Sequence, residues 1–194
     1  LVMIQCNNMK LVFENRLIFD INDLTFEKGK LHLIKGENGS GKSSLFRCMI
    51  AWILSSSGNV KVNGSWTYQP QNFHLFSPKI KDNFEVTTQV MEWLNVLNLN
   101  KQIDLHVSKL SGGERQKVAL VRTLLQDTDI YLLDEPTSYM DESSKAVSYA
   151  LIQEELLDKG KTVLLISHDN NDLPFKSGIV YRITNQKLFI EKVW

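Results

Sequence analysis

GENGSGKS, residues 36–43, fits the pattern G-x-x-x-x-G-K-[S/T] of a phosphate-binding loop. Its glycines allow the backbone to curl so that N–H groups point inward and form a nest for an anion. A helix that starts here adds its positive N-terminal dipole. Lys42 supplies a charge for the β- and γ-phosphates of a nucleotide, and Ser43 supplies a hydroxyl ligand for Mg²⁺.

The segments on either side of this loop decide whether it binds phosphate, because a glycine turn that contains Lys and Ser also arises by chance. LHLIK (31–35) before it indicates a strand. After it, Leu45, Met49 and Trp52 or Ile53 recur at helical spacing and predict a helix from about Lys42 to Ser55. Strand, loop and helix follow in the required order, so the stretch predicts nucleotide binding.

The rest of the chain predicts an α/β fold in which strands and helices alternate. Residues 3–29 hold short β-rich runs broken by Asn, Asp and Gly, which favour an N-terminal antiparallel β subdomain. Residues 130–135 and 161–167 are apolar runs typical of buried parallel strands, residues 143–159 are helical in pattern, and the chain is β-rich from 178. Residues 1–194 are expected to form one domain with a P-loop core and a mainly parallel sheet. Amphipathic helices at about 78–125 predict an inserted α-helical subdomain.

Composition limits the classes of partner. Lys plus Arg and Asp plus Glu both number 22, and a formal net charge of zero argues against nucleic acid as the main partner. The two cysteines, Cys6 and Cys48, cannot form a disulfide framework and lack metal-ligand spacing. The longest apolar run, 49–54, is far shorter than the ~20 residues of a membrane span, and the first residues do not resemble a signal peptide. A role at a membrane would therefore require another chain to hold this one there.

Two acids end the apolar run of IYLLDEPT (130–137). A carboxylate at the C-terminal end of a parallel strand points into the crevice where ligands bind. Asp134 is therefore expected to hold Mg²⁺, directly or through water, and Glu135 to act as general base on the attacking water. Two solvated acids at a strand end are the alternative, but the phosphate loop in the same chain favours the catalytic interpretation.

LSGGERQ (110–116) predicts a second anion-binding helix terminus. Ser111 can cap a helix, and the glycines that follow leave N–H groups free at its start. SGG alone would also suit a flexible turn.

With GENGSGKSS, LSGGERQKVALVRTLL and IYLLDEPT in one chain, the sequence resembles the ATP-binding cassette (ABC) family along nearly its whole length. SYMD (138–141) resembles the family's D-loop, with Tyr139 and Met140 where Ala and Leu are usual, and LLISHD (164–169) contains its switch histidine. YQPQNFHLF (68–76) resembles the Q-loop, and the family's spacing selects Gln71 over Gln69.

The resemblance implies ATP and Mg²⁺ as cofactors and assigns the site residues. Glu135, His168 and Gln71 are the expected catalytic residues, and Ser43, Gln71 and Asp134 the expected metal ligands. Phe13, 29 positions before Lys42, is the expected adenine-stacking residue, with Phe19 as its rival. The nucleotide-binding set is Phe13, Gly36, Glu37, Asn38, Gly39, Ser40, Gly41, Lys42, Ser43, Ser44, Ser111, Gly112, Gly113 and Asp141.

The resemblance also implies partners. ATP on the P-loop of one subunit would be covered by Ser111, Gly112 and Gly113 of another, in a homodimer or in a heterodimer with a related ATPase. An integral-membrane transporter subunit would hold the protein on the cytoplasmic face of the cell membrane, and no nucleic acid is expected.

Residues 58–71 and 79–84 favour an exporter-type member. Near the Q-loop, Phe73, Leu75, Phe76 and Trp93 are candidates equally for a partner-binding groove and for core packing.

Two other functions remain open at this level. One is a soluble cassette ATPase in DNA repair, translation or cofactor assembly, although the chain has one P-loop and no inserted coiled coil or zinc module. The other is a non-catalytic nucleotide-dependent module, which would have lost a catalytic residue. Lys42, Asp134, Glu135 and His168 are all present, so hydrolysis is the expected activity.

Overall fold

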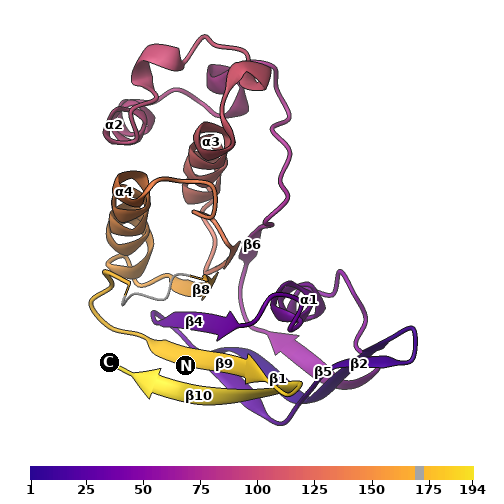
Figure 1. Cartoon of the computed structure of the whole chain (residues 1–194). Helices are drawn as coiled ribbons and strands as arrows, with labels where there is room; N and C mark the ends of the chain where they lie inside the picture. The colour runs from indigo at the N-terminus through magenta and orange to yellow at the C-terminus, as the bar shows by residue number, and fades with distance from the viewer. Residues whose placement is uncertain (169–172) are drawn as a thin grey trace.

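The computed structural model describes residues 1–168 and 173–194, and two β-sheets form its framework (Figure 1). The first sheet is antiparallel. Its strand β1 (Val2–Phe13) pairs with β2 (Arg16–Ile21), β3 (Leu24–Glu27) and β5 (Ser57–Val62). The antiparallel strands predicted at the N-terminus are therefore present, and β5 joins them from beyond the first helix.

The second sheet has six strands in the order β10-β9-β4-β8-β7-β6. Five of them are parallel, and the edge strand β10 (Lys187–Val193) runs antiparallel to β9. The parallel strands are β4 (Leu31–Gly36), β6 (Trp66–Gln69), β7 (Ile130–Asp134), β8 (Thr162–Ile166) and β9 (Ile179–Thr184). Strands β7 and β8 are buried at every residue, as a parallel strand covered on both faces requires. The predicted α/β fold with a mainly parallel sheet is confirmed.

Helices cover both faces of this sheet. Helix α1 (Lys42–Met49) packs on the face shared with the antiparallel sheet. The other face carries α2 (Thr88–Val96), α3 (Gly112–Leu124) and α4 (Glu142–Ile152), which continues as the π-helical turn η4 (Gln153–Leu157). Short 3-10 helices η1 (Ile80–Asn83), η2 (Asn100–Gln102) and η3 (Val107–Lys109) connect α2 to its neighbours. The boundaries of the helical subdomain, about 78–125, stay a prediction.

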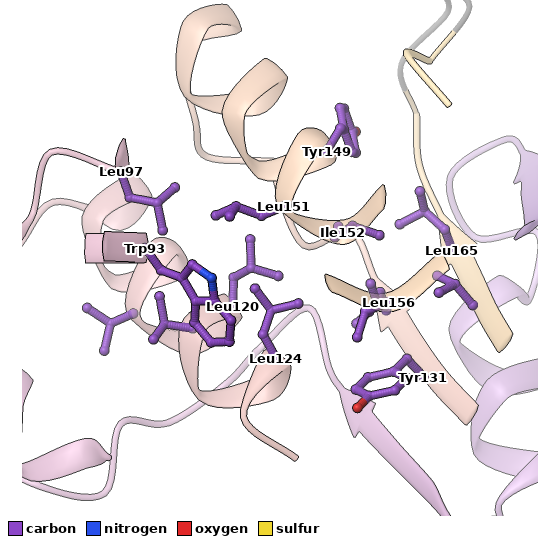
Figure 2. Close-up of a cluster of buried hydrophobic side chains, with 14 of the residues drawn as sticks. Trp93, Leu97, Leu120, Leu124, Tyr131, Tyr149, Leu151, Ile152, Leu156 and Leu165 are labelled. Atoms are coloured by element: carbon purple, nitrogen blue, oxygen red, sulfur yellow. The ribbon is translucent and has the colours of Figure 1, made fainter. Parts of the chain in front are cut away.

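The larger hydrophobic core lies between these three helices and the sheet. Figure 2 shows Trp93 of α2 against Leu120 and Leu124 of α3, with Leu151 and Ile152 of α4 beside them. The side chains of Tyr131 and Leu165 reach this cluster from β7 and β8. Trp93 is therefore a core residue, which decides between the two roles left open for it.

Helix α1 is shorter than the sequence pattern predicts. It ends at Met49, and Ala51 adopts a left-handed conformation with φ of 58°. The N–H groups of Trp52 and Ile53 turn back to the carbonyl of Arg47. The prediction of a helix to Ser55 was wrong because Trp52 and Ile53 continue the apolar spacing without continuing the helix. Trp52 instead stacks edge-on against Tyr68 of β6, with ring centroids 5.1 Å apart.

Candidate active site

A cavity of about 650 Å³ opens at the C-terminal edge of the parallel strands. Segments that are far apart in the sequence meet there, because β4, β7 and β8 are parallel neighbours and end at the same edge. The lining residues are Ile18, Asn38, Gly39, Gly41, Lys42, Ser43, Ser44, Gln71, Glu135, Thr137, Ser138, Lys145, Ser167 and His168.

The phosphate loop connects β4 to α1, as the sequence predicts. Gly41 occupies the N-cap position of α1 with φ of 95°, in the left-handed region that favours glycine. A Cβ there would lie 2.8 Å from Cγ2 of Ile18, so the close approach of β2 also requires glycine. Glycine has no side chain to cap α1, and no other side chain of the described residues does so. The N–H groups at this helix start are therefore available to an anion.

Lys42 is buried, and its ammonium group is held by the loop itself. Its Nζ donates to the carbonyl oxygens of Gly36 at 2.9 Å and Glu37 at 2.8 Å. Desolvation lowers the pKa of Lys42, and the carboxylates of Glu135 and Asp134 oppose that shift. These two neutral acceptors can be exchanged for phosphate oxygens, which form stronger charge-assisted hydrogen bonds.

Asp134 ends β7 and is almost fully buried. The hydroxyl of Tyr68 donates to its Oδ2 at 3.0 Å, whereas Oδ1 has no hydrogen-bond partner within residues 1–168 and 173–194. Burial raises the pKa of Asp134, and the hydroxyls of Ser43 and Tyr68 oppose this by stabilising the carboxylate. A buried oxygen without a partner is costly. Mg²⁺ prefers hard oxygen ligands, and Oδ1 of Asp134 and the hydroxyl of Ser43 are two such oxygens. These two residues therefore fit the metal ion that the family resemblance implies.

Glu135 lies at the centre of the polar groups in the cavity. Its Oε1 is 2.5 Å from Nε2 of His168, and its Oε2 accepts a hydrogen bond of 2.7 Å from Nε2 of Gln71. The backbone of Glu135 is left-handed, with φ of 52°, which costs a non-glycine residue on the order of 1 kcal/mol. The structure thus brings together all three predicted catalytic residues. Asp169, the last residue of the predicted switch stretch, lies outside the described residues.

Several predicted nucleotide-binding residues lie away from this cavity. Glu37 and Ser40 line a second cavity of about 320 Å³, which shares Ile18, Asn38 and Gly39 with the first. Ser111 caps α3: its Oγ accepts from the N–H of Glu114 at 3.2 Å, while Glu114 Oε2 accepts from the N–H of Ser111. Neither Ser111 nor the two glycines after it is among the residues that line the main cavity.

The structure also shows where Asp141 and the two candidate adenine-stacking residues, Phe13 and Phe19, lie. Asp141 caps α4, accepting hydrogen bonds from Ser143 and Ser144 that hold the pKa of its carboxyl far below the usual range. Its carboxylate therefore acts as the N-cap of α4 in this structure. Phe19 is fully buried, which excludes it from stacking on a ligand, whereas Phe13 is 64% exposed at the end of β1. Phe13 is not among the lining residues of either cavity.

Sequence reasoning missed five residues that line the main cavity: Ile18, Thr137, Ser138, Lys145 and Ser167. Thr137, Ser138 and Ser167 lie within the recognised motifs, so their positions next to Glu135 and His168 in the sequence could have predicted that they line the cavity. Ile18 and Lys145 come from β2 and α4, and only the tertiary fold places them here.

Comparisons with known proteins agree with this geometry. The model of the ABC transporter family matches residues 19–138. A probable metal transport system ATP-binding protein of Thermotoga maritima is 34% identical over 187 residues, covering 83% of this chain and 76% of that protein. The zinc import ATP-binding protein ZnuC of Wolbachia sp. subsp. Brugia malayi is 30% identical, covering 86% and 74%.

Solved structures show the same fold. A putative metal-chelate type ABC transporter in an inward-facing conformation matches 99% of this chain and 84% of its own, with a TM-score of 0.78 and 22% identity. RNase-L Inhibitor matches with a TM-score of 0.83 and 23% identity, but this chain spans only 39% of it. None of these relatives supports the exporter type expected from residues 58–84. The chain belongs to the ABC transporter family, as an ATP-binding subunit that hydrolyses ATP.

Proposed function

We propose that this chain hydrolyses Mg-ATP in the main cavity, in a dimer, and that the hydrolysis drives a membrane transporter of the import type. The observation that carries the catalytic part is the placement of the Glu135 carboxylate between Gln71 and His168, in the same cavity as Lys42.

Glu135 is the group that accepts a proton from the attacking water, because its carboxylate lines the cavity beside Gln71 and His168. Gln71 and His168 hold that carboxylate from two sides, so the proton acceptor keeps one orientation. Lys42 exchanges the two loop carbonyls for phosphate oxygens. Ser43, Asp134 and Gln71 would hold Mg²⁺, which supplies positive charge against the β- and γ-phosphates.

The proposed dimer follows from the separation of the two anion-binding helix starts. The N-terminus of α1 faces the main cavity, whereas Ser111, Gly112 and Gly113 at the start of α3 do not line it. A second subunit can bring its own α3 to the phosphates, which would complete each site with residues from two chains. The partner in that dimer is a second copy of this chain or a related ATPase.

The proposed transport role rests on the relatives and on exposed apolar side chains near the Q-loop. Phe76 is 83% exposed, with the Arg122 guanidinium 4.6 Å from its ring centroid, while Phe73 and Leu75 are partly buried. Exposed aromatic residues beside an arginine are typical of protein interfaces. Among the described residues, no helix has the length and hydropathy needed to cross a bilayer. The relatives named as ATP-binding proteins of transport systems lead us to propose a peripheral location on the cytoplasmic face of the membrane, held by an integral-membrane subunit.

Relatives named for metal transport and zinc import lead us to propose a metal ion as the cargo and import as the direction. The test is capture of an integral-membrane partner from detergent-solubilised native membranes. Phe76→Asp should abolish capture, because a carboxylate would be desolvated in the interface. Phe189→Asp, at an exposed aromatic position on β10, is the matched control and should capture normally.

Recovery of the wild-type chain with no membrane partner would refute the transport role. Equal loss of capture in both variants would show that Phe76 does not mark the docking surface. Uptake of radioactive zinc by vesicles that contain the captured complex then tests the cargo and its direction.

A further inference from the structure

Gln116 of α3 makes a set of contacts that its position in the motif LSGGERQ does not reveal. Its side chain is 1% exposed, and every hydrogen-bonding group it carries reaches the segment after β7. Its Nε2 donates to the carbonyl oxygen of Glu135 at 2.8 Å and to Oγ of Ser138 at 3.1 Å. Its Oε1 accepts from the N–H of Tyr139 at 2.9 Å.

The start of α3 packs against the same segment, one turn before Gln116. A Cβ on Gly113 would lie 2.7 Å from the carbonyl oxygen of Tyr139, and one on Gly112 would lie 3.5 Å from the Tyr139 Cβ. The backbones are therefore in close contact at the first turn of α3. The amide of Gln116 adds a directional connection between this helix and residues 135–139.

The backbone of Glu135 needs such a connection because its conformation is unfavourable for a residue with a side chain. Its φ of 52° lies in the left-handed region. Its N–H donates to the carbonyl of Ile166 at 3.1 Å. Its carbonyl accepts from Gln116 at 2.8 Å and, over a longer distance of 3.2 Å, from the hydroxyl of Ser138. Both main-chain polar groups of Glu135 are thus fixed by other elements, and this sets the direction in which its carboxylate points.

We propose that Gln116 is a positioning residue for ATP hydrolysis: it holds the backbone of Glu135 and the 138–139 segment to the first turns of α3. Through Gln116, the helix that presents Ser111, Gly112 and Gly113 and the segment that presents Glu135 keep a fixed relation within one chain. The inference rests on the role proposed above for Glu135.

A buried amide that only stabilises the fold is the competing interpretation, and the two differ in what they change. Loss of a purely structural contact lowers the melting temperature and does not single out the chemical step. Loss of a positioning contact lowers kcat while the affinity for ATP is kept, because, among the described residues, the hydrogen bonds of the Gln116 side chain go to residues 135, 138 and 139 and not to the P-loop.

The experiment compares Gln116→Met with Thr123→Val. Met has a similar length but no amide. Thr123 is also buried on α3, and among the described residues its Oγ1 donates only to the Ala119 carbonyl of its own helix, at 2.9 Å. We expect single-turnover hydrolysis by Gln116→Met to fall about 10- to 100-fold, the scale of a small misplacement of a catalytic group. ATP affinity, measured with a fluorescent analogue, should stay within about twofold, and Thr123→Val should keep the wild-type rate.

Hydrogen exchange supplies a second readout. In Gln116→Met, the amides of residues 135–141 should exchange faster, with the Tyr139 N–H affected most, whereas Thr123→Val should show no change there. Gln116→Asn keeps an amide but is one methylene too short to reach residues 135–139, so it should show the same loss of rate. It is the test variant if Gln116→Met does not fold.

A wild-type rate in both Gln116 variants would overturn the inference, as would an equal loss of rate in Thr123→Val or a loss of ATP affinity that matches the loss of rate. Glu135→Gln is assayed in parallel. A wild-type rate in that variant means that the role proposed for Glu135 has failed. An inactive Glu135→Gln beside unimpaired Gln116 variants means that the present inference alone has failed.

Discussion

At the scale of single residues, His32 shows how burial affects an ionisable side chain. It lies on β4 with no exposed surface, its Nδ1 is 3.1 Å from the Tyr181 hydroxyl, and its Nε2 is 3.0 Å from the Glu27 carbonyl oxygen. Desolvation lowers the pKa of His32 from 6.5 to about 4. The imidazole is therefore a neutral core group that connects β4 to β3 and β9.

This depressed pKa predicts a loss of stability in mild acid. The unfolded chain takes up a proton near pH 6.5, whereas the folded chain does so only near pH 4. The contribution of His32 is therefore fully present above pH 6.5 and is lost as the pH falls towards 4, by about 3 kcal/mol at the full shift. His32→Gln cannot titrate, so its free energy of unfolding from urea melts should vary less with pH over this range. Parallel pH profiles for the variant and the wild type would contradict the assignment.

At the scale of secondary-structure elements, the sequence predicted the existence and type of helices better than their ends. Ser111 and Glu114 form a capping box that marks the start of α3, and Asp141 marks the start of α4. The end of α1 carries no such signal. Helices commonly end with glycine in the left-handed position, but here that residue is Ala51.

The left-handed conformation of Ala51 predicts that glycine at this position stabilises the protein, whereas glycine at a helical alanine should destabilise it. Ala51→Gly should raise the free energy of unfolding by about 1 kcal/mol, because glycine adopts a positive φ without the Cβ clash. Ala146, an exposed residue inside α4, should respond in the opposite way, and Ala146→Gly should lower stability by about 1 kcal/mol. Urea denaturation of both variants measures the two shifts. A decrease in both would show that Ala51 is not strained.

At the scale of the whole molecule, the motifs could be predicted to share one site because parallel strands deliver their C-terminal ends to one edge. That argument joined residues 36–43 with residues 134–135, whereas His168 was predicted from the family resemblance. It could not supply Ile18 or Lys145, which reach the cavity only through the packing of β2 and α4. Nor could it reveal the Gln116 contacts, because a glutamine in the second turn of an amphipathic helix has no distinguishing local pattern.

The start of α3 provides a test of the proposed dimer. Ser111 is exposed, so Ser111→Arg should fold and bind ATP, but its bulky charge would obstruct the approach of a second subunit's phosphates. Ser111→Ala is the control, since it removes the same cap, worth about 1 kcal/mol, without adding bulk. We expect the arginine variant to lose hydrolysis and the alanine variant to keep most of it. Wild-type activity of the arginine variant, or wild-type specific activity that does not fall on dilution, would argue for a self-sufficient monomer.

Glu135→Gln tests the catalytic and the assembly proposals together. The amide keeps the size of the side chain and can still bond water, but it cannot accept the proton, so hydrolysis should fall by about 10²- to 10⁴-fold. Lys42, Ser43 and Asp134 stay intact, so ATP should still bind and hold two subunits together without being consumed. Size-exclusion chromatography should then show a dimer with ATP and a monomer with ADP, whereas the wild type should form the dimer only transiently.

Asp134→Asn is the matched variant one residue earlier. Its amide weakens the proposed metal site, so it should be inactive without accumulating a stable dimer in Mg-ATP. Hydrolysis at the wild-type rate by Glu135→Gln would place the proton acceptor elsewhere in the cavity. An inactive Glu135→Gln that stays monomeric with ATP would preserve the role of the carboxylate and reject a dimer of identical chains. The same chromatography, repeated with a related ATPase from the same genome, would then show whether the second α3 comes from a different chain.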